Sequence, residues 1–157
     1  MMTIFDQKIE MENFCNRCKS LGLAVTVQRR AVYQILLDSL EHPSADKIYE
    51  ELITQYPNIS RTSVYRILDT FARYGIIRKV DHPGAATRYD AYVFPHHHAV
   101  CVSCGEIIDV PFSSGDDEAL RRVQRQMNDF IIRDYMVTFQ GICHVCKNKE
   151  EDYHFRT

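Results

Sequence analysis

The sequence contains no apolar stretch near the roughly 20 residues that a membrane-spanning helix needs, and its first residues lack the basic segment and apolar core of a secretion signal. Internal repeats and low-complexity segments are also absent. Glycine and proline are few, with 6 and 5 residues among 157, and this ordinary globular composition excludes a collagen-like chain, a long disordered tail and a simple coiled coil. These absences predict a soluble cytoplasmic protein with no membrane partner.

The six cysteines are the most informative residues of the sequence. In a short secreted chain they would indicate disulfides, but in a reducing cytosol closely spaced cysteines more often hold a metal or carry out redox chemistry. Seven histidines accompany them, three of them adjacent at residues 96–98. Metal binding is therefore the leading hypothesis for the Cys-x-x-Cys pairs Cys15/Cys18, Cys101/Cys104 and Cys143/Cys146.

The first half of the chain has the apolar periodicity and the end signals of helices. Thr26, Ser44 and Ser60 are placed to cap helix N-termini. Gly22 and Gly75 stand where a glycine commonly ends a helix. The predicted helices cover about residues 5–21, a segment that starts at 27, the segment from 45 to just before Pro57, and residues 61–74.

The last two of these helices are joined by the short turn 57–59, as in a helix-turn-helix motif whose second helix reads DNA. Strands are predicted at 76–80 and 87–89, with a turn at 81–84 between them. A hairpin directly after a recognition helix makes a winged helix, so residues 1–88 are expected to form a DNA-binding domain. The alternative is a small helical domain with a hairpin and no role in DNA binding.

The second half changes in character after a short hinge near residues 89–95. Basic side chains are in excess over residues 1–88 and acidic side chains over 89–157, which indicates two units with different roles. We therefore predict an α+β protein of two domains in tandem. The second domain, 89–157, is expected to contain strands at 97–102, 106–110 and 131–142 and a helix at 116–130.

Two of the cysteine pairs have the spacing of a zinc site. A Cys-x-x-Cys turn brings two thiolates within reach of one metal, and two such turns complete a closed tetrahedral site that contributes to folding. The predicted ligands of this structural zinc are Cys101, Cys104, Cys143 and Cys146. Two disulfides or reduced thiols are the alternatives. The pair Cys15/Cys18 shares a helix face, which leaves a third site or a redox role open, but we interpret both as ordinary helix residues.

The adjacent histidines predict a second metal site. Side chains alternate along a strand, so His96 and His98 face one side and the residue between them faces the other. Imidazole and carboxylate ligands suit iron, manganese or zinc. Further candidate ligands are Asp90, Asp109 and His42.

These residues resemble the ferric-uptake-regulator (Fur) family of bacterial metal-responsive repressors, from about Leu21 to Cys146. Proteins of this family are homodimers with an N-terminal winged helix-turn-helix domain and a C-terminal α/β dimerisation domain. The resemblance therefore implies a cytoplasmic bacterial repressor that binds a double-stranded DNA operator with an inverted repeat. It rests on six stretches: Val25-Thr-Val-Gln-Arg29, His42-Pro-Ser-Ala-Asp46, Ser63-Val-Tyr-Arg66, Arg88-Tyr-Asp90, His96-His-His-Ala-Val-Cys-Val-Ser-Cys104 and Cys143-His-Val-Cys146.

Carried over residue by residue, the resemblance assigns the four cysteines of the second domain to the structural zinc. It assigns a regulatory site for Fe²⁺ or Mn²⁺ to His42, Asp90, His96, His98 and Asp109. Because these ligands come from both domains, the metal would select the arrangement that fits DNA. Metal binding and DNA binding would then strengthen each other.

The branch of the family is indicated by Asp90 and Asp109, because two aspartates, with no glutamate at the latter position, resemble the peroxide-sensor branch. In such sensors bound Fe²⁺ reacts with hydrogen peroxide and the product oxidises a ligand histidine, after which the repressor loses its metal and leaves DNA. By analogy the oxidation-sensitive residues here are His42 and His96. Arg66 after Tyr65 instead resembles an iron-uptake regulator, which is the alternative. The absence of cysteine among the implied regulatory ligands argues against a zinc-uptake sensor.

DNA contact is predicted at the N-terminus of the recognition helix. Helix N-termini and arginine suit phosphates, arginine also reads guanine edges, and an aromatic ring can pack on a thymine methyl. Partial core packing beside Val64 is the alternative for the tyrosine. The predicted contact residues are Ser60, Arg61, Thr62, Ser63, Tyr65 and Arg66.

Two other classes of protein compete with a repressor. Histidine and aspartate also bind metals in hydrolases and oxygenases, but a catalytic site keeps an open coordination position and a positioned acid or base. Five candidate ligands leave little room for a substrate, so we expect no enzymatic activity. A metal-storage or purely structural zinc protein would, like an enzyme, show no metal-dependent affinity for DNA. No small-molecule ligand is expected beyond the metal and hydrogen peroxide.

Overall fold

The computed structural model describes residues 4–39, 41–81, 86–127, 129–132 and 135–154. The chain divides into two compact units, Met1–Val93 and Phe94–Thr157. The domain division predicted after residue 88 falls inside the strand Arg88–Asp90, which pairs with the strand before it and therefore stays with the first unit. Among the described helices, none combines the length and the apolar character that crossing a membrane requires.

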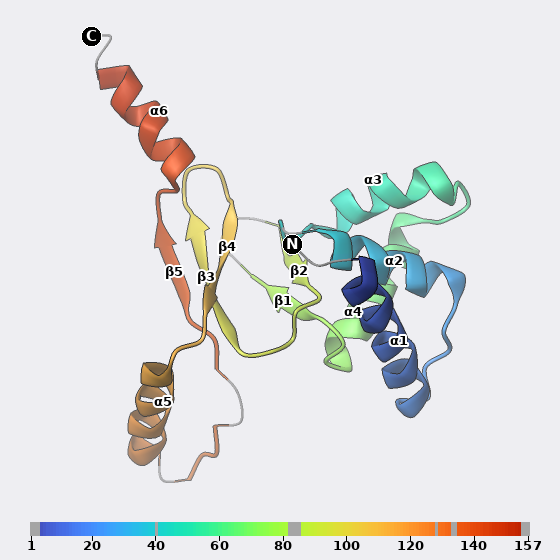
Figure 1. Ribbon diagram of the computed structural model, residues 1–157, viewed down its shortest axis with the longest axis horizontal. Coiled ribbons are helices and arrows are strands. Elements are labelled where there is room, and N and C mark those ends of the chain that lie inside the picture. Colours follow the sequence, from blue (N-terminus) through green and yellow to red (C-terminus); the bar gives the residue numbers. More distant parts are fainter. Residues whose placement is uncertain (1–3, 40, 82–85, 128, 133–134, 155–157) are drawn as a thin grey trace. The chain divides into compact units, whose positions relative to one another are not determined.

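The described elements of the first unit are α1 (Ile4–Ser20), α2 (Val27–Asp38), α3 (Ala45–Gln55), α4 (Arg61–Arg73), β1 (Arg78–Val80) and β2 (Arg88–Asp90). Residues 56–60 connect α3 to α4 in the helix-turn-helix arrangement (Figure 1). β1 and β2 pair in antiparallel fashion and follow α4 as a wing. The winged helix-turn-helix prediction is confirmed, while the predicted turn at 81–84, apart from Asp81, lies outside the described residues.

Local interactions set where the helices of this unit begin and end. The side-chain oxygens of Thr26, Ser44 and Ser60 each accept a hydrogen bond from the backbone N–H three residues later, over 3.1–3.3 Å. Gly22 and Gly75 have φ angles of 69° and 64° and follow the ends of α1 and α4. This left-handed conformation is easy only for a residue without Cβ. All five predicted end signals are confirmed.

An aromatic cluster joins the helices into one core. The ring of Phe14 stacks on Tyr33 with centroids 4.1 Å apart and meets Phe71 edge-on at 5.3 Å. Val64 and Leu68, on the same side of α4 as Phe71, are fully buried. α4 buries this side in the core, and its opposite side is exposed.

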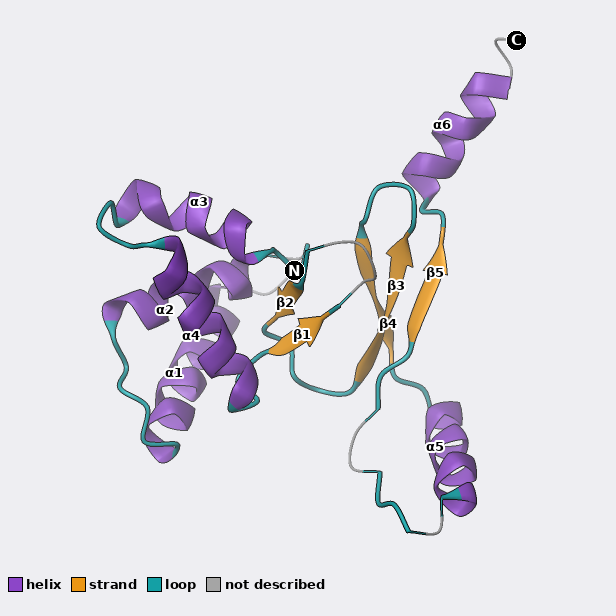
Figure 2. Ribbon diagram, turned by 180° about the vertical axis from the view of Figure 1, so that it is seen from behind, coloured by secondary structure: helices purple, strands orange, loops and turns teal. Residues whose placement is uncertain are grey.

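The described elements of the second unit are β3 (His96–Cys101), β4 (Ile107–Pro111), α5 (Ser114–Gln126), β5 (Thr138–Gly141) and α6 (His144–His154). The strands form one sheet in the order β4-β3-β5 (Figure 2). β4 is antiparallel to β3, and β5 is parallel to it. α5 lies in the connection between β4 and β5, which are the two outer strands of the sheet. β3 is therefore the central strand. The predicted α+β fold class is confirmed.

Two predicted elements of the second unit have different bounds in the structure. Of the strand predicted at 131–142, the described part forms a strand over Thr138–Gly141, and residues 133–134 lie outside the described residues. The helix predicted at 116–130 spans Ser114–Gln126, and residue 128 lies outside the described residues. β5 is short because a strand needs backbone hydrogen-bonding partners, and among the described residues β3 provides a register for these four alone. α6 was not predicted from the sequence, because its residues are largely charged and lack a clear apolar stripe.

Candidate metal centres

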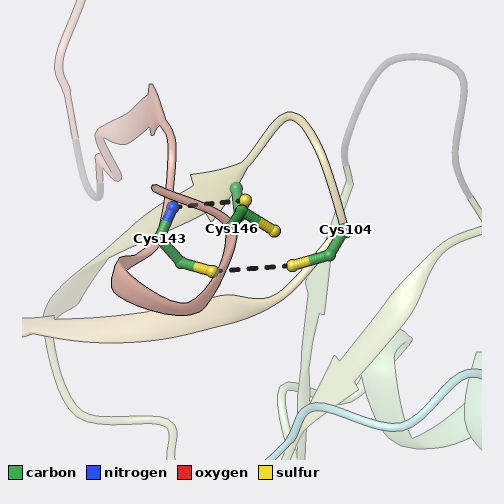
Figure 3. Close-up of side chains that lie close together, drawn as sticks. Cys104, Cys143 and Cys146 are labelled. Carbon is green, nitrogen blue, oxygen red and sulfur yellow. Dashed lines mark hydrogen bonds between the residues drawn. The ribbon is translucent and has the colours of Figure 1, made fainter. Parts of the chain in front are cut away.

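The two cysteine pairs of the second unit meet at one end of its sheet. Cys101 is the last residue of β3, and Cys143 comes shortly after β5. β3 and β5 run parallel, with Cys101 opposite Gly141. Cys101 and Cys143 therefore lie at the same end of the sheet. Cys104 lies in the turn after β3 and Cys146 in the first turn of α6. Figure 3 shows the sulfurs of Cys104 and Cys143 turned toward each other.

The four sulfur atoms have the spacing of zinc ligands. All four Sγ atoms lie within 4.8 Å of one another, and those of Cys104 and Cys143 are 3.7 Å apart (Figure 3). Tetrahedral zinc with Zn–S bonds of about 2.3 Å places its sulfurs about 3.8 Å apart. A disulfide needs sulfurs about 2.05 Å apart, and all six cysteines are free thiols. The cluster therefore fits a four-thiolate zinc and does not fit two disulfides.

A backbone amide prepares Cys101 for metal binding. The N–H of Cys143 donates a hydrogen bond to Cys101 Sγ over 3.3 Å. This N–H and, after it, the backbone N–H of Cys104 lower the pKa of the Cys101 thiol to about 6, because hydrogen bonds to sulfur favour the charged form. The thiolate is the form that binds metal. These hydrogen bonds therefore favour the thiolate form of Cys101.

His96, His98 and Asp109 form a second cluster on one face of the sheet. The antiparallel register of β3 and β4 sets His98 directly opposite Asp109. The Nε2 atoms of the two histidines are 2.9 Å apart, and Asp109 Oδ1 lies 3.6 Å from His96 Nε2 and 3.5 Å from His98 Nε2. Neighbouring ligands at bond lengths of about 2.1 Å lie about 3.0–3.4 Å apart. The three ligand atoms therefore fit a single metal ion.

Hydrogen bonds on the far side of each ring orient these histidines. His96 Nδ1 lies 2.8 Å from the carbonyl oxygen of Phe94, which can only accept, so this nitrogen carries the proton. His98 Nδ1 lies 3.2 Å from the thioether sulfur of Met136, another acceptor. Both Nε2 atoms are then left with lone pairs that face each other, an arrangement that a shared cation stabilises.

The middle histidine has a packing role. His97 points to the other face of β3, where its ring lies 5.5 Å from Phe112, 5.6 Å from Tyr135 and 6.4 Å from Phe139, measured between centroids. The N–H of Val137 donates to its Nδ1 over 3.3 Å. The predicted alternation of the three histidines is confirmed, and His97 stands apart from the ligand cluster.

The first unit contains an imidazole–carboxylate pair of its own. His42 Nε2 lies 3.8 Å from Asp90 Oδ2, and both residues are buried. The carbonyl of His42 accepts from Arg88 Nη1 over 3.4 Å, and Asp90 Oδ1 accepts from the N–H of Tyr92 over 2.7 Å. His42 has a φ of 48°, in the left-handed region that few residues other than glycine adopt. The structure thus holds this pair in a defined place.

The predicted DNA-contact residues lie at the start of α4. Ser60 is the N-cap, with its Oγ 2.9 Å from Ser63 Oγ. Thr62 and Arg66 are exposed, and Tyr65 is 43% exposed, so packing beside the core does not hide its ring. These side chains are therefore accessible on the side of α4 that the core leaves uncovered.

Arg61 differs from the other residues of this group, because its guanidinium already has two partners. It forms an ion pair with Asp46 and lies over the ring of Tyr49, 4.7 Å from the centroid. Both partners belong to α3. Arg61 therefore braces the two helices of the motif, a role that the sequence pattern did not reveal.

The pair Cys15/Cys18 belongs to the core of the first unit. Cys18 is fully buried, and Cys15 packs against the same cluster. Burial raises the pKa of the Cys18 thiol, which disfavours the thiolate that metals and oxidants require. The structure therefore favours ordinary packing for both residues.

Two groups beside the histidines were not identified from the sequence. The carbonyl of Phe94 is a backbone group and leaves no sequence signal. Met136 is 38 residues from His98 along the chain and reaches it because β5 lies next to β3. Only long-range strand pairing could reveal this contact.

The chain is similar to known proteins over most of its length. The family profile described as the ferric uptake regulator family matches residues 20–139. The peroxide-responsive repressor PerR of Staphylococcus aureus is 30% identical over 140 residues, which are 89% of this chain and 93% of that protein. The structure of the Helicobacter pylori ferric uptake regulator Fur, described as revealing three functional metal-binding sites, has a TM-score of 0.71 at 25% identity and covers 90% of this chain and 93% of its own. The Campylobacter jejuni peroxide stress regulator has a TM-score of 0.67 at 30% identity and covers 76% and 88%.

Proposed function

The chain belongs to the ferric uptake regulator family, and from this we infer that it is a metal-dependent, DNA-binding transcriptional repressor that responds to hydrogen peroxide. The observation that carries the inference is the cluster of His96, His98 and Asp109 in a chain that is 30% identical to a peroxide-responsive repressor. The winged helix-turn-helix supplies the surface for DNA. The protein is therefore a regulator, and we propose no enzymatic activity for it.

The thiolate cluster holds a structural Zn²⁺ in this proposal. Its support is the spacing of the four sulfurs and the hydrogen bond that the N–H of Cys143 donates to Cys101 Sγ. A closed site with four protein ligands has no open position for a substrate, so this zinc acts on folding. By linking the ends of β3 and β5, it stabilises the unit that we propose as the dimerisation domain.

The regulatory Fe²⁺ or Mn²⁺ takes its ligands, in this proposal, from both units: His42, Asp90, His96, His98 and Asp109. Imidazole and carboxylate groups are the donors that suit such ions, and neither unit alone offers more than three of them. The bound iron supplies the reaction with peroxide. The protein's own groups do the rest: the Phe94 carbonyl holds the Nδ1 proton of His96 and so directs its Nε2 toward the other ligands.

A metal shared by two units links metal binding to DNA binding. The ion favours the arrangement of the units in which all five ligands reach it, and DNA favours the arrangement that fits its half-sites. If these arrangements coincide, metal and DNA strengthen each other's binding by the same factor. Oxidation of His42 or His96 removes a ligand, weakens metal binding and therefore releases the DNA.

The DNA partner is a double-stranded operator with an inverted repeat, and the second protein partner is another copy of this chain. A two-fold symmetric dimer presents two recognition helices, and half-sites related by the same symmetry match them. An operator-binding regulator of a bacterial family works in the cytoplasm. This placement, like the dimer, is part of the proposal.

A second candidate within the family is an iron-uptake regulator, which reads the concentration of Fe²⁺ without being oxidised. It is favoured by one observation, the arginine that follows Tyr65 in α4. The peroxide sensor is better supported by the identity to PerR over 93% of that protein's length.

The proposal is tested by loading the protein with Fe²⁺ without oxygen and adding a near-stoichiometric pulse of hydrogen peroxide. We expect an added oxygen on His42 or His96 together with loss of operator binding, because the oxidised imidazole is a poorer ligand. Peptide mass mapping measures the first effect and fluorescence anisotropy with an operator duplex measures the second.

Protein loaded with Mn²⁺ is the control for this experiment and is expected to keep both its histidines and its DNA affinity. His144, an exposed histidine outside the cluster, serves as the internal reference for nonspecific oxidation. Unmodified histidines and intact DNA binding in the iron-loaded protein would instead identify an iron-uptake regulator.

Arg66→Ala is expected to weaken operator binding by about 1–3 kcal/mol, the usual cost of a lost arginine contact to a base. Arg73→Ala is the matched control, since it removes the same charge from another exposed arginine in the last turn of the same helix. The measurement is operator affinity at fixed salt with Mn²⁺ present. Equal losses in the two variants would reduce the effect of Arg66 to nonspecific attraction between charge and phosphate.

A further inference from the structure

The thioether of Met136 is a neighbour of the metal ligands that the proposed function does not use. Its Sδ lies 3.2 Å from His98 Nδ1, on the opposite side of the ring from the Nε2 that faces His96 and Asp109. Carbonyls, carboxylates and water are the usual outer partners of metal-binding histidines, and His96 has such a partner in the Phe94 carbonyl. A thioether differs from all of these because it is readily oxidised.

We propose that Met136 is an additional modification site of this chain, which peroxide converts to methionine sulfoxide when iron occupies the His96, His98 and Asp109 cluster. The proposal rests on the proposed function, because it needs a peroxide-reactive iron at that cluster. A single imidazole ring separates the sulfur from the ligand atom of His98. The thioether of Met136 would therefore lie close to the origin of any oxidant that iron supplied when bound by these ligands.

The overall step transfers one oxygen atom from hydrogen peroxide to sulfur. The O–O bond of the peroxide breaks and an S–O bond forms on Met136, while the second oxygen leaves with both protons as water. Sulfur gives up two electrons and the peroxide takes up the same two. The electrons that sulfur gives up are those that the peroxide takes up, so no further oxidant or reductant is needed.

A second methionine of the same unit allows the effect of closeness to the metal ligands to be distinguished from the effect of exposure to dissolved peroxide. Met136 is 37% exposed and Met127, which follows α5, is 39% exposed, so dissolved peroxide reaches both to a similar extent. Within the described residues, Met127 makes no hydrogen bond to a histidine ring. The Nδ1–H of His98 donates a hydrogen bond to the sulfur of Met136, which makes this sulfur less nucleophilic than that of Met127. Preferential oxidation of Met136 therefore requires a local source of oxidant.

The modification is reversible in principle. Methionine sulfoxide is restored by dedicated reductases, and the sulfoxide replaces a soft acceptor beside His98 by a polar, bulkier group. Oxidation of Met136 would therefore alter the support of one metal ligand without destroying the ligand itself.

The experiment compares the two methionines in the full-length protein. Fe²⁺-loaded, Mn²⁺-loaded and regulatory-metal-free protein is pulsed with hydrogen peroxide, then alkylated and digested with trypsin. Arg125, Arg133 and Lys147 place Met127 and Met136 on different peptides, 126–133 and 134–147. Oxygen that methionine sulfoxide reductase removes from a peptide lies on methionine and not on histidine.

In the iron-loaded protein we expect the sulfoxide at Met136 to exceed that at Met127 several-fold. In the other two samples Met136 should be oxidised no faster than Met127. His98→Ala, which removes the adjacent ligand, is expected to abolish the preference. Met127→Leu should leave the oxidation of Met136 unchanged.

The outcome separates this inference from the proposed function. Equal oxidation of the two methionines, with oxygen added to His42 or His96, overturns the role of Met136 and leaves the peroxide sensor in place. A Met136 preference that is independent of iron also overturns it. Absence of any iron-dependent oxidation at histidine or methionine overturns both.

Discussion

Cys101→Ser is expected to remove the zinc and the dimer in a single step. The hydroxyl of serine is a poor zinc ligand, and the three remaining thiolates leave the tetrahedral site incomplete. Structural zinc binds small domains with an apparent free energy of about 10–16 kcal/mol, which is as large as the stability of a whole domain. Without the metal, the ends of β3 and β5 lose their link and the second unit is expected to unfold in large part.

Zinc content by elemental analysis and molar mass by light scattering measure the two effects of this variant together. Cys15→Ser is the control, because Cys15 is a partly buried residue of α1 outside the cluster. It is expected to keep one zinc per chain and the dimer. A zinc-free Cys101→Ser dimer of normal thermal stability would show that the four thiols have no structural role.

His98→Ala is expected to abolish the metal-dependent part of operator binding and to leave the structural zinc in place. His98 is fully buried on the central strand, and its Nε2 lies within 3.5 Å of two other candidate ligands. Its loss should lower the affinity for the regulatory ion, and with it the allosteric gain in DNA affinity, which is typically about 5–150-fold.

Titration of operator affinity with Mn²⁺ at fixed salt measures this gain. His97→Ala is the matched control on the same strand, because its ring packs on the opposite face against Phe112, Tyr135 and Phe139. This variant should lose packing stability but retain the response to metal. If His98→Ala responds to Mn²⁺ as the unmodified protein does, His98 is not a ligand of the regulatory ion.

Much of the architecture of the first unit could be predicted because its signals are local. Thr26, Ser44 and Ser60 cap helices through N–H groups only three residues away, and Gly22 and Gly75 act through their own φ angles. The alternation of the three histidines is equally local, since it follows from the pleat of a single strand.

The errors arise where an element depends on a partner that is distant in sequence. Within the part of the chain that the structure describes, β5 is shorter than the predicted strand, because β3 pairs with it over four residues there. Arg61, which the sequence predicts as a DNA contact, also pairs with Asp46 and Tyr49 on the preceding helix, and the sequence pattern did not indicate these partners. Charge and hydropathy along the chain do not encode such pairings.

The candidate ligands themselves could be named from the amino-acid sequence, because thiol, imidazole and carboxylate groups are the usual metal donors of proteins. Spacing alone was not sufficient, since Cys15 and Cys18 have the same spacing and pack in the core. Tertiary structure alone decided how the ligands meet. The parallel pairing of β3 with β5 brings Cys101 and Cys143 to one end of the sheet. The register of β3 with β4 places His98 opposite Asp109. The pairing of β3 with β5 also places Met136 beside His98. The spacing of residues along the chain determines which groups are local neighbours. Long-range strand pairing is instead stabilised by backbone hydrogen bonds and by buried apolar surface, and both depend on the whole sheet.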